Sequence, residues 1–416
     1  MGRVTFIALV ATLALGVAGC GSGGDAGGPP TLNLYTFTAG SGGAFEAAVK
    51  RCNARANGRY TIRIQDLPPN ADDQREQLAR RLAAKDASID IAALDVIFTG
   101  EFAEAKWVLP FPAAQAEAVR RGTIRSTLET GTYQGKLYAA PFTSNTQLLW
   151  YRKDRVDAPP KTWAELFRQA RKLGGRKSIV EVQGAQAEGY VVWFNALVQS
   201  AGGRILSSPT KVDLADGPTR AALEVMRTAG SAPFADPSQP TQAEDEGRIA
   251  FETGDPSFMV NYPFIYPSAK ENAPEVFRNI GAARFPSVSA SEPSAPPLGG
   301  LNLAVGAYTK HEAESFDAAL CIREPRNQLL ATKLGGLPPT QEALFSDRVV
   351  KQAYPGFADL MRESIEAAGP RPATPAYSDL SLGIQETLHP ASSVRPGDAP
   401  ALRDTLQDAL DGKGLL

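Results

Sequence analysis

A polar segment between two apolar runs carries the first residues that could bind a ligand. Leu137–Ala140 and Leu148–Tyr151 are apolar and rich in aromatic residues, and Pro141 and Asn145 lie in the stretch between them. Because Pro141 lacks a backbone N–H, the pattern predicts a strand, a pause and a second strand. An amide such as Asn145 both donates and accepts hydrogen bonds, which suits a neutral polyol. We therefore expect this segment to cross between two lobes, with Asn145 facing the cleft.

Carboxylates are the second group of residues with a chemical use. Asp95 stands near the end of the apolar run Ile89–Val96, and α/β domains bind ligands beyond the carboxyl ends of such strands. An equally good interpretation is a cap or loop residue before a helix that starts near Glu101. The acidic group Glu244–Glu246 begins another helix, and the helix dipole alone accounts for it. Paired carboxylates such as Asp95 and Glu244 also leave open a secreted glycoside hydrolase.

Composition argues against several other chemistries. The chain holds two histidines, His311 and His389, in unrelated contexts, so no metal site and no cofactor are expected. The formal charge is −2 and no basic run stands out, which makes nucleic acid and anionic membrane surfaces poor partners. The small numbers of His and Met residues give no support to a binder of peptides or metal chelates.

The elements that must position these residues alternate between strands and helices. Leu32–Tyr35, Tyr60–Ile64 and Ile89–Val96 have the pattern of strands, with a helical pattern between each pair, which predicts an α/β domain. A chain of 416 residues exceeds the size of one core, so two domains are expected. Thr162–Glu165 is a capping box that begins a second α/β unit, and Leu298–Val305 is a second candidate crossing.

The N-terminus predicts export. Arg3 precedes the apolar run Val4–Val17, which is shorter than the ~20 residues of a membrane-spanning helix and has the size of a signal sequence, here residues 1–19. Val17–Cys20 resembles the bacterial lipobox, whose cysteine is diacylated and becomes the first mature residue. An ordinary signal peptide with an incidental cysteine is the alternative. Residues 20–30 are rich in Gly and Pro and predict a flexible tether. We expect a body anchored by lipid to the outer face of the cell membrane.

Two cysteines remain if Cys20 is lipidated. Cys52 recurs with Phe45 and Val49 at helical spacing, which places it on a buried face, and Cys321 lies in the amphipathic stretch Glu314–Ile322. In an exported protein, one remaining pair most simply forms one disulfide. Two separate buried thiols are the alternative.

Several short segments, in this order and spacing, resemble one family over residues 31–416. They are Gly135–Pro141, Leu148–Tyr151, Ala250–Gly254, Gly299–Gly300 and Gly335–Pro338. With them the chain is similar to the extracellular solute-binding proteins of sugar ABC importers, the maltose-binding group. Further segments resemble the trehalose-binding lipoproteins of mycobacteria and their relatives: Gln77–Leu82, Ala93–Val96, Glu101–Ala105, Lys136–Pro141, Asn145–Arg152, Gly299–Val305 and Arg371–Pro375.

This resemblance implies an architecture. It is the two-lobe periplasmic-binding-protein fold of the α/β class, in which each lobe is a sheet flanked by helices and hinge strands cross between the lobes. The N-terminal lobe would take residues 31–141 with 299–337, and the C-terminal lobe 142–298 with 338–416. The resemblance also supports a disulfide between Cys52 and Cys321.

The resemblance implies a function as well. The chain would act as a monomer without catalysis, closing on trehalose or a closely related disaccharide and delivering it to the permease of an ABC importer. Carried over to this sequence, the sugar contacts fall on Asp95, Asn145, Glu244, Tyr262, the backbone of Gly300 and Leu301, and Arg371. The chain departs from these relatives in two places, where they have Trp instead of Tyr262 and an acidic residue in the first loop instead of Ser41.

Overall fold

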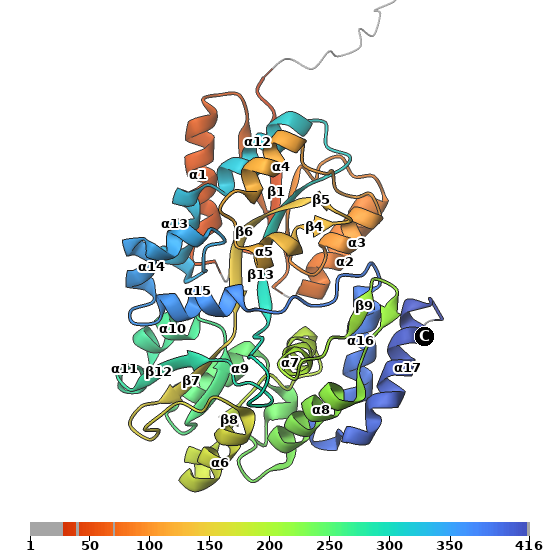
Figure 1. Ribbon diagram of the computed structural model, residues 1–416. Coiled ribbons are helices and arrows are strands. Elements are labelled where there is room, and N and C mark those ends of the chain that lie inside the picture. The colour runs from red at the N-terminus through yellow and green to blue at the C-terminus, as the bar shows by residue number, and fades with distance from the viewer. Residues whose placement is uncertain (1–27, 39–40, 70, 414–416) are drawn as a thin grey trace, which may run out of the picture.

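The computed structural model describes residues 28–38, 41–69 and 71–413, which form two lobes, one above the other in Figure 1. The predicted signal sequence and Cys20 lie outside the described residues, as does most of the predicted tether. In the part of the chain that is described, no helix is both long and apolar enough to cross a membrane.

The first lobe is built on a five-stranded sheet with the order β2-β1-β3-β13-β6. β1 pairs in parallel with β2 and β3, and α1 and α2 connect them, which confirms the alternation predicted from the sequence. β13 joins from far along the chain and runs antiparallel to β3 and β6. The bounds are β1 Thr31–Thr36, α1 Ala44–Ala56, β2 Thr61–Asp66, α2 Ala71–Ala83, β3 Ile91–Asp95, β6 Ala139–Thr146 and β13 Leu298–Val305.

A disulfide ties α1 to α12 (Glu312–Ile322) inside this lobe. Cys52 lies on the buried face of α1, as its helical spacing predicts, and its Cα atom is 5.9 Å from that of Cys321. The predicted disulfide is therefore present, and the alternative of two separate thiols is wrong. The bond closes a covalent loop between residues 269 positions apart.

The crossing segment differs from the predicted strand, pause and strand. β6 runs without interruption through the polar stretch to Thr146, and β7 (Leu148–Arg152) starts two residues later in the second lobe. Pro141 is tolerated because the register shifts beside it: Asn302 pairs with Pro141 while Leu301 pairs with Thr143, so Phe142 is an extra residue in a bulge. The pause predicted at Pro141 is thus a local irregularity inside one long strand.

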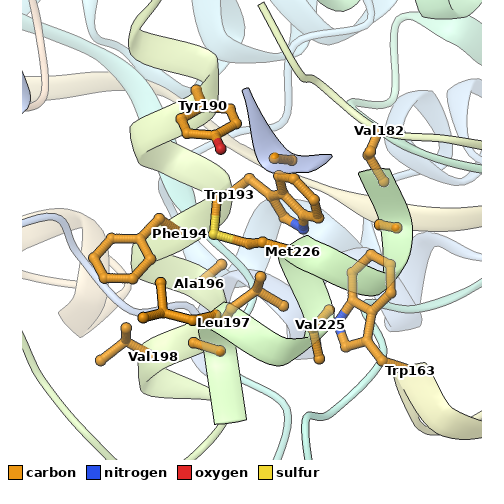
Figure 2. Close-up of a cluster of buried hydrophobic side chains, with 14 of the residues drawn as sticks. Trp163, Val182, Tyr190, Trp193, Phe194, Ala196, Leu197, Val198, Val225 and Met226 are labelled. Carbon is orange, nitrogen blue, oxygen red and sulfur yellow. The ribbon is translucent and has the colours of Figure 1, made fainter. Parts of the chain in front are cut away.

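The second lobe surrounds a four-stranded sheet with the order β12-β7-β11-β8. Side chains from its two faces pack into two different hydrophobic cores. Leu149 and Val260 lie in the first core, and Trp150 and Met259 lie in the second. Figure 2 shows part of the first of these cores, in which the indole of Trp193 on α7 lies near Trp163 of α6 and Met226 of α8. The bounds are α6 Trp163–Leu173, β8 Val180–Glu181, α7 Glu188–Gln199, α8 Asp216–Ser231, α9 Glu244–Glu252, β11 Phe258–Asn261, β12 Ile280–Arg284, α16 Tyr377–Leu388 and α17 Ala399–Leu410.

Three connections pass between the lobes. They are β6 to β7, the segment from β12 into β13, and the segment after α13 (Pro325–Gly335), where the backbone N–H of Ser144 donates to the carbonyl of Pro338 at 2.9 Å. A further segment, Ala367–Ala376 between α15 (Ala358–Glu366) and α16, runs along the boundary between the lobes (Figure 1) and is called the strap below. The predicted lobe limit at 337 lies in the third connection, those at 141 and 299 lie inside β6 and β13, and all three stay a prediction.

The other elements complete the two lobes. The helices are α3 Thr99–Glu104, α4 Ala113–Arg120, α5 Arg125–Thr130, α10 Ile265–Asn272, α11 Pro274–Phe277, α13 Pro325–Gly335, α14 Arg348–Ala353 and α15 Ala358–Glu366. The short strands are β4 Thr132–Tyr133, β5 Lys136–Leu137, β9 Leu206–Ser208 and β10 Lys211–Val212.

Candidate functional site

Asp95 supplies the first carboxylate of the site from the first lobe. It is the last residue of β3, and its Oδ1 accepts hydrogen bonds from the backbone N–H of Ile97 at 3.2 Å and from Nη2 of Arg371 at 3.1 Å. Its Oδ2 takes part in neither bond. Because α3 begins only at Thr99, Asp95 does not cap that helix. Asp95 thus lies at the strand end and also stabilises the turn that leads to α3, so its role as a ligand contact stays a prediction.

The crossing strands β6 and β13 supply an amide and open backbone. Asn145 is half-buried and pairs with Gly299, while the carbonyl of Gly300 accepts from the backbone N–H of Val96 at 3.3 Å. Gly300 has φ +135°, and a Cβ there would lie 2.2 Å from the carbonyl oxygen of Thr143, so this position requires glycine. The next residue, Leu301, pairs with Asp95 across the sheet. Gly300 thus allows the close approach of β13 to β6, and Gly299 lies against Asn145.

Glu244 and Tyr262 supply the second lobe's wall. Glu244 is the first residue of α9, and Tyr262 directly follows β11. The side chain of Asn261 fixes both, because its Nδ2 donates to the carbonyl of Glu244 at 2.9 Å and its Oδ1 accepts from the backbone N–H of Tyr262 at 2.8 Å. The Tyr262 ring reaches the crossing strands, since its Cε1 is 3.9 Å from where a Cβ of Gly299 would be. One asparagine therefore sets the spacing of two predicted site residues.

Arg371 lies on the strap and contacts carboxylates from both lobes. Besides Asp95, its guanidinium pairs with Glu188 at the start of α7, with Nη1 2.7 Å from Oε1. The hydroxyls of Tyr377 and Ser381 also donate to Glu188. The Arg371 side chain is 4% exposed and that of Glu188 is 13% exposed. The predicted residues Asp95 and Arg371 are therefore directly bonded, and Glu188 is an additional member of the site.

Charge interactions connect these groups into one site. Burial alone would lower the pKa of Arg371, but the charges of Asp95 and Glu188 raise it well above its usual value. Burial, followed by the charges of Asp245 and Asp95, raises the pKa of Glu244 to about 7. Glu244 is nevertheless exposed to solvent at the first turn of α9.

Tyr262 and Glu188 respond to the same enclosed environment. Burial raises the pKa of Tyr262, and the charge of Glu244 adds to the effect. Burial also raises the pKa of Glu188, while the guanidinium of Arg371 opposes that shift. Titratable groups whose pKa values are shifted by burial and by one another's charges are typical of a functional site.

Two hollows flank the bond between Asp95 and Arg371. One, of about 350 Å³, lies between α2 and α16 and is lined by Asp72, Arg75, Ser381 and Gln385, among others. The second, of about 270 Å³, is lined by the strap residues Pro370–Ala373 and by residues that follow β3. Neither is lined by Asn145, Glu244 or Tyr262, so of the predicted contacts only Arg371 lines a hollow.

Glu188 is the residue that sequence reasoning missed. An acidic residue in the first turn of a helix is explained by the helix dipole, so its type and position gave no reason to single it out. Its partner Arg371 is 183 residues away, and only the folded chain brings the two together.

Within the described residues, no cluster of three or more His, Cys, Asp or Glu side chains could hold a metal ion.

Comparison with known proteins identifies the family of this chain. The family model for bacterial extracellular solute-binding proteins matches residues 16–320. A probable ABC transporter-binding protein of Deinococcus radiodurans is 28% identical over 400 residues, which cover 91% of this chain and 93% of the relative. A maltotriose-binding protein of Pyrococcus abyssi is 25% identical over 296 residues, covering 70% of this chain and 62% of that protein.

Solved structures show the same fold. The maltose-bound MalE3 of T. maritima superimposes with a TM-score of 0.81 at 23% identity, covering 92% of this chain and 100% of that one. The GacH receptor of Streptomyces glaucescens, also solved with acarbose, gives 0.79 at 19% identity and covers 92% and 99%. These likenesses confirm the predicted two-lobe architecture. Relatives of this kind are binding proteins, not enzymes, and on the family match the chain belongs to the bacterial extracellular solute-binding proteins.

Proposed function

We propose that this chain is the lipid-anchored substrate-binding component of an ABC sugar importer, and that it binds trehalose or a closely related disaccharide between its lobes. One observation carries the proposal. Arg371 binds Asp95 across the lobes, the charges of both act on Glu244 and Tyr262, and the Tyr262 ring lies beside Gly299, the pairing partner of Asn145. The named relatives that bind maltotriose and diacetylchitobiose support a saccharide ligand.

The chemistry of these groups fits a disaccharide. Carboxylates and a guanidinium bind neighbouring hydroxyls through charge-assisted hydrogen bonds, each contributing about 1.5–3 kcal/mol. Asp95 keeps Oδ2 outside its two internal bonds, and Asn145 uses only its Oδ1, which accepts from the backbone N–H of Thr146. The face of Tyr262 would cover the C–H face of a sugar ring.

Binding would proceed by hinge closure without chemistry on the ligand. Asp95 belongs to the first lobe, whereas Glu244 and Tyr262 belong to the second, so only the closed form makes both sets of contacts. The closed form is then the state that a permease would recognise. Diacylation of Cys20 would keep the binding protein at the outer face of the membrane, close to that permease.

Isothermal titration calorimetry on the soluble form lacking residues 1–20 tests the ligand. We expect trehalose to bind more tightly than maltose, sucrose or glucose, with maltotriose and diacetylchitobiose included as the ligands of named relatives. Glu117→Gln, an exposed acid on α4, is the matched control and should bind like wild type. Tighter binding of maltotriose than of trehalose would redirect the specificity, and binding of no saccharide would reject the function.

Two further assays separate the remaining parts of the proposal. Trehalose incubated with the protein should release no glucose, because the proposed role is capture and delivery. Release in proportion to protein, lost in Asp95→Asn, would favour the hydrolase. Metabolic labelling with palmitate should mark the full chain and leave Cys20→Ala unlabelled. Equal labelling of both would place the lipid elsewhere.

A further inference from the structure

The strap is fixed to α7 of the second lobe at two points. The side chain of Gln199, at the end of α7, donates from Nε2 to the carbonyl of Pro370 at 2.8 Å. At the other end of the same helix, Glu188 binds Arg371. The neighbouring Gly369 lies so close to Gln199 that a Cβ there would be 1.6 Å from its Oε1. The strap is thus packed against α7 and moves with the second lobe.

Glu188 uses its accepting capacity on internal donors. Its Oε1 accepts from Arg371 and from the hydroxyl of Tyr377, and its Oε2 accepts from the hydroxyl of Ser381 at 2.6 Å. Tyr377 and Ser381 both lie on α16, whose later residues pack in the core of the second lobe, while the Tyr377 side chain packs against the first lobe. The carboxylate is therefore held rigidly by three donors and is nearly excluded from solvent. In this structure the carboxylate binds the guanidinium of Arg371 rather than a ligand.

The opposite end of the guanidinium meets the first lobe. Nη2 of Arg371 lies 3.1 Å from Oδ1 of Asp95, whose side chain is 24% exposed. Asp95, Arg371 and Glu188 thus form a continuous chain of charges from the end of β3 to the start of α7. A chain of this kind can be complete only when the lobes are close together.

We propose that Glu188 is a positioning residue for sugar binding: it holds Arg371 on the second lobe, oriented so that closure of the lobes brings its Nη2 onto Asp95. The inference rests on the proposed function, since the sugar is what closure would trap. Glu188 touches no sugar in this scheme. It raises affinity by fixing in advance the one cation that binds both the ligand and the opposite lobe, which lowers the entropy cost of closure.

The test measures closure and affinity in the same variants. Spin labels on Lys50→Cys in α1 and Lys172→Cys in α6, both exposed positions, report the distance between the lobes, and the native cysteines are bonded to each other. Calorimetry with trehalose reports affinity. Glu188→Gln keeps the size of the side chain and removes its charge, whereas Tyr377→Phe keeps the charge and removes one donor. Glu117→Gln is again the control.

We expect Glu188→Gln to weaken trehalose binding about 10- to 30-fold, because a charge-assisted bond becomes a neutral one. At a fixed trehalose concentration it should also shift the distance distribution toward the open form. Tyr377→Phe should weaken binding by roughly 3-fold, in keeping with loss of one hydrogen bond to the carboxylate. The control should match wild type in both measurements, and unfolding temperatures confirm that each variant is folded.

Three outcomes separate the inference from the function on which it rests. If the wild type binds no saccharide, the proposed function is rejected by calorimetry alone. If Glu188→Gln and wild type give the same distance distributions with and without trehalose, the positioning role is overturned whether or not sugar binds. If Glu188→Gln loses affinity while its closed fraction stays unchanged, Glu188 contacts the ligand directly, which also overturns the role.

Discussion

The two lobes contribute different kinds of groups to the candidate site. The first lobe contributes Asp95 at the end of a strand, in a sheet whose helices α1 and α12 are joined by a disulfide. The second lobe contributes Glu188, Glu244 and Tyr262 and also fixes the strap that carries Arg371. The first lobe, braced by the disulfide, carries Asp95 and, on β6 and β13, Asn145, Gly300 and Leu301, whereas the second lobe carries an acid, an aromatic ring and the strap. We therefore expect the second lobe to contribute the cation and the ring face to specificity.

The second lobe also buries an acid that lacks the partners of Glu188. Glu181 on β8 of the second lobe is fully buried, and neither of its carboxyl oxygens has a hydrogen-bond partner among the described residues. Burial, together with the charge of Asp236, raises the pKa of Glu181 to about 8. Two acids of the same lobe thus differ sharply, since Glu188 has three donors and Glu181 has none. The second lobe holds its polar groups at some cost in stability.

The largest effect should come from removing the brace of the first lobe. Replacing Cys52 and Cys321 by Ser should destabilise that lobe by about 2–5 kcal/mol, because the bond closes a long loop in the unfolded chain. Hydrogen exchange should show the loss of protection in β1–β3 and α1. Wild type treated with reductant is the control and should behave alike. Equal loss of protection in both lobes would mean that the two unfold as one unit, which would break the comparison.

Removing either partner of the interlobe ion pair should have the next largest effect. Arg371→Ala and Asp95→Ala should each weaken trehalose binding roughly 30- to 150-fold, equivalent to about 2–3 kcal/mol, because each leaves a hydroxyl network without its charged partner. Small-angle scattering should show wild type contracting with trehalose and Asp95→Ala failing to contract. Binding within twofold of wild type in both variants would contradict the site.

Glu181 allows a test of how much a buried acid lowers the stability of the second lobe. A carboxyl group whose pKa rises from 4.5 unfolded to about 8 folded keeps its proton in the folded state, so its contribution to stability is present below pH 4.5 and is lost as pH rises to 8. Glu181→Gln cannot titrate. It should therefore be more stable than wild type at pH 8, on the order of 2 kcal/mol, and similar at pH 4.5. Calorimetric unfolding at both values checks this. A wild type that gains stability between these values relative to Glu181→Gln would refute it.

The smallest effect should come from the aromatic ring. Tyr262→Trp should keep or slightly strengthen trehalose binding, because a larger ring face covers more of the sugar, while Tyr262→Ala should lose about 1 kcal/mol. Calorimetry on the two variants sharpens the assignment of specificity to the second lobe. If Trp weakened binding as much as Ala, the ring would act through its hydroxyl.

Most elements could be predicted because helix and strand patterns are local in the sequence. The disulfide could be predicted because the N-terminus indicates export and one pair of cysteines remains once Cys20 is set aside. Asn145 was predicted from an isolated amide, and Glu244 and Tyr262 from a family resemblance. In the structure Asn261 links Glu244 to Tyr262, whose ring lies beside Gly299, and their role in binding stays a prediction. The continuation of β6 through Pro141 could not be foreseen, since it depends on a register shift opposite Asn302. Glu188 was missed for a similar reason: its partners Arg371, Tyr377 and Ser381 all come from the C-terminal part of the chain.

The position of Cys321 has a consequence for the order in which the exported chain can fold. Cys52 leaves the cell early, but its partner follows 269 residues later, together with β13 and α12, which complete the first lobe. The second lobe also waits, because α16 and α17 at the end of the chain close its core. The first lobe therefore cannot complete its sheet or its disulfide until β13 and α12 have crossed the membrane, and the second lobe is completed later still, by α16 and α17.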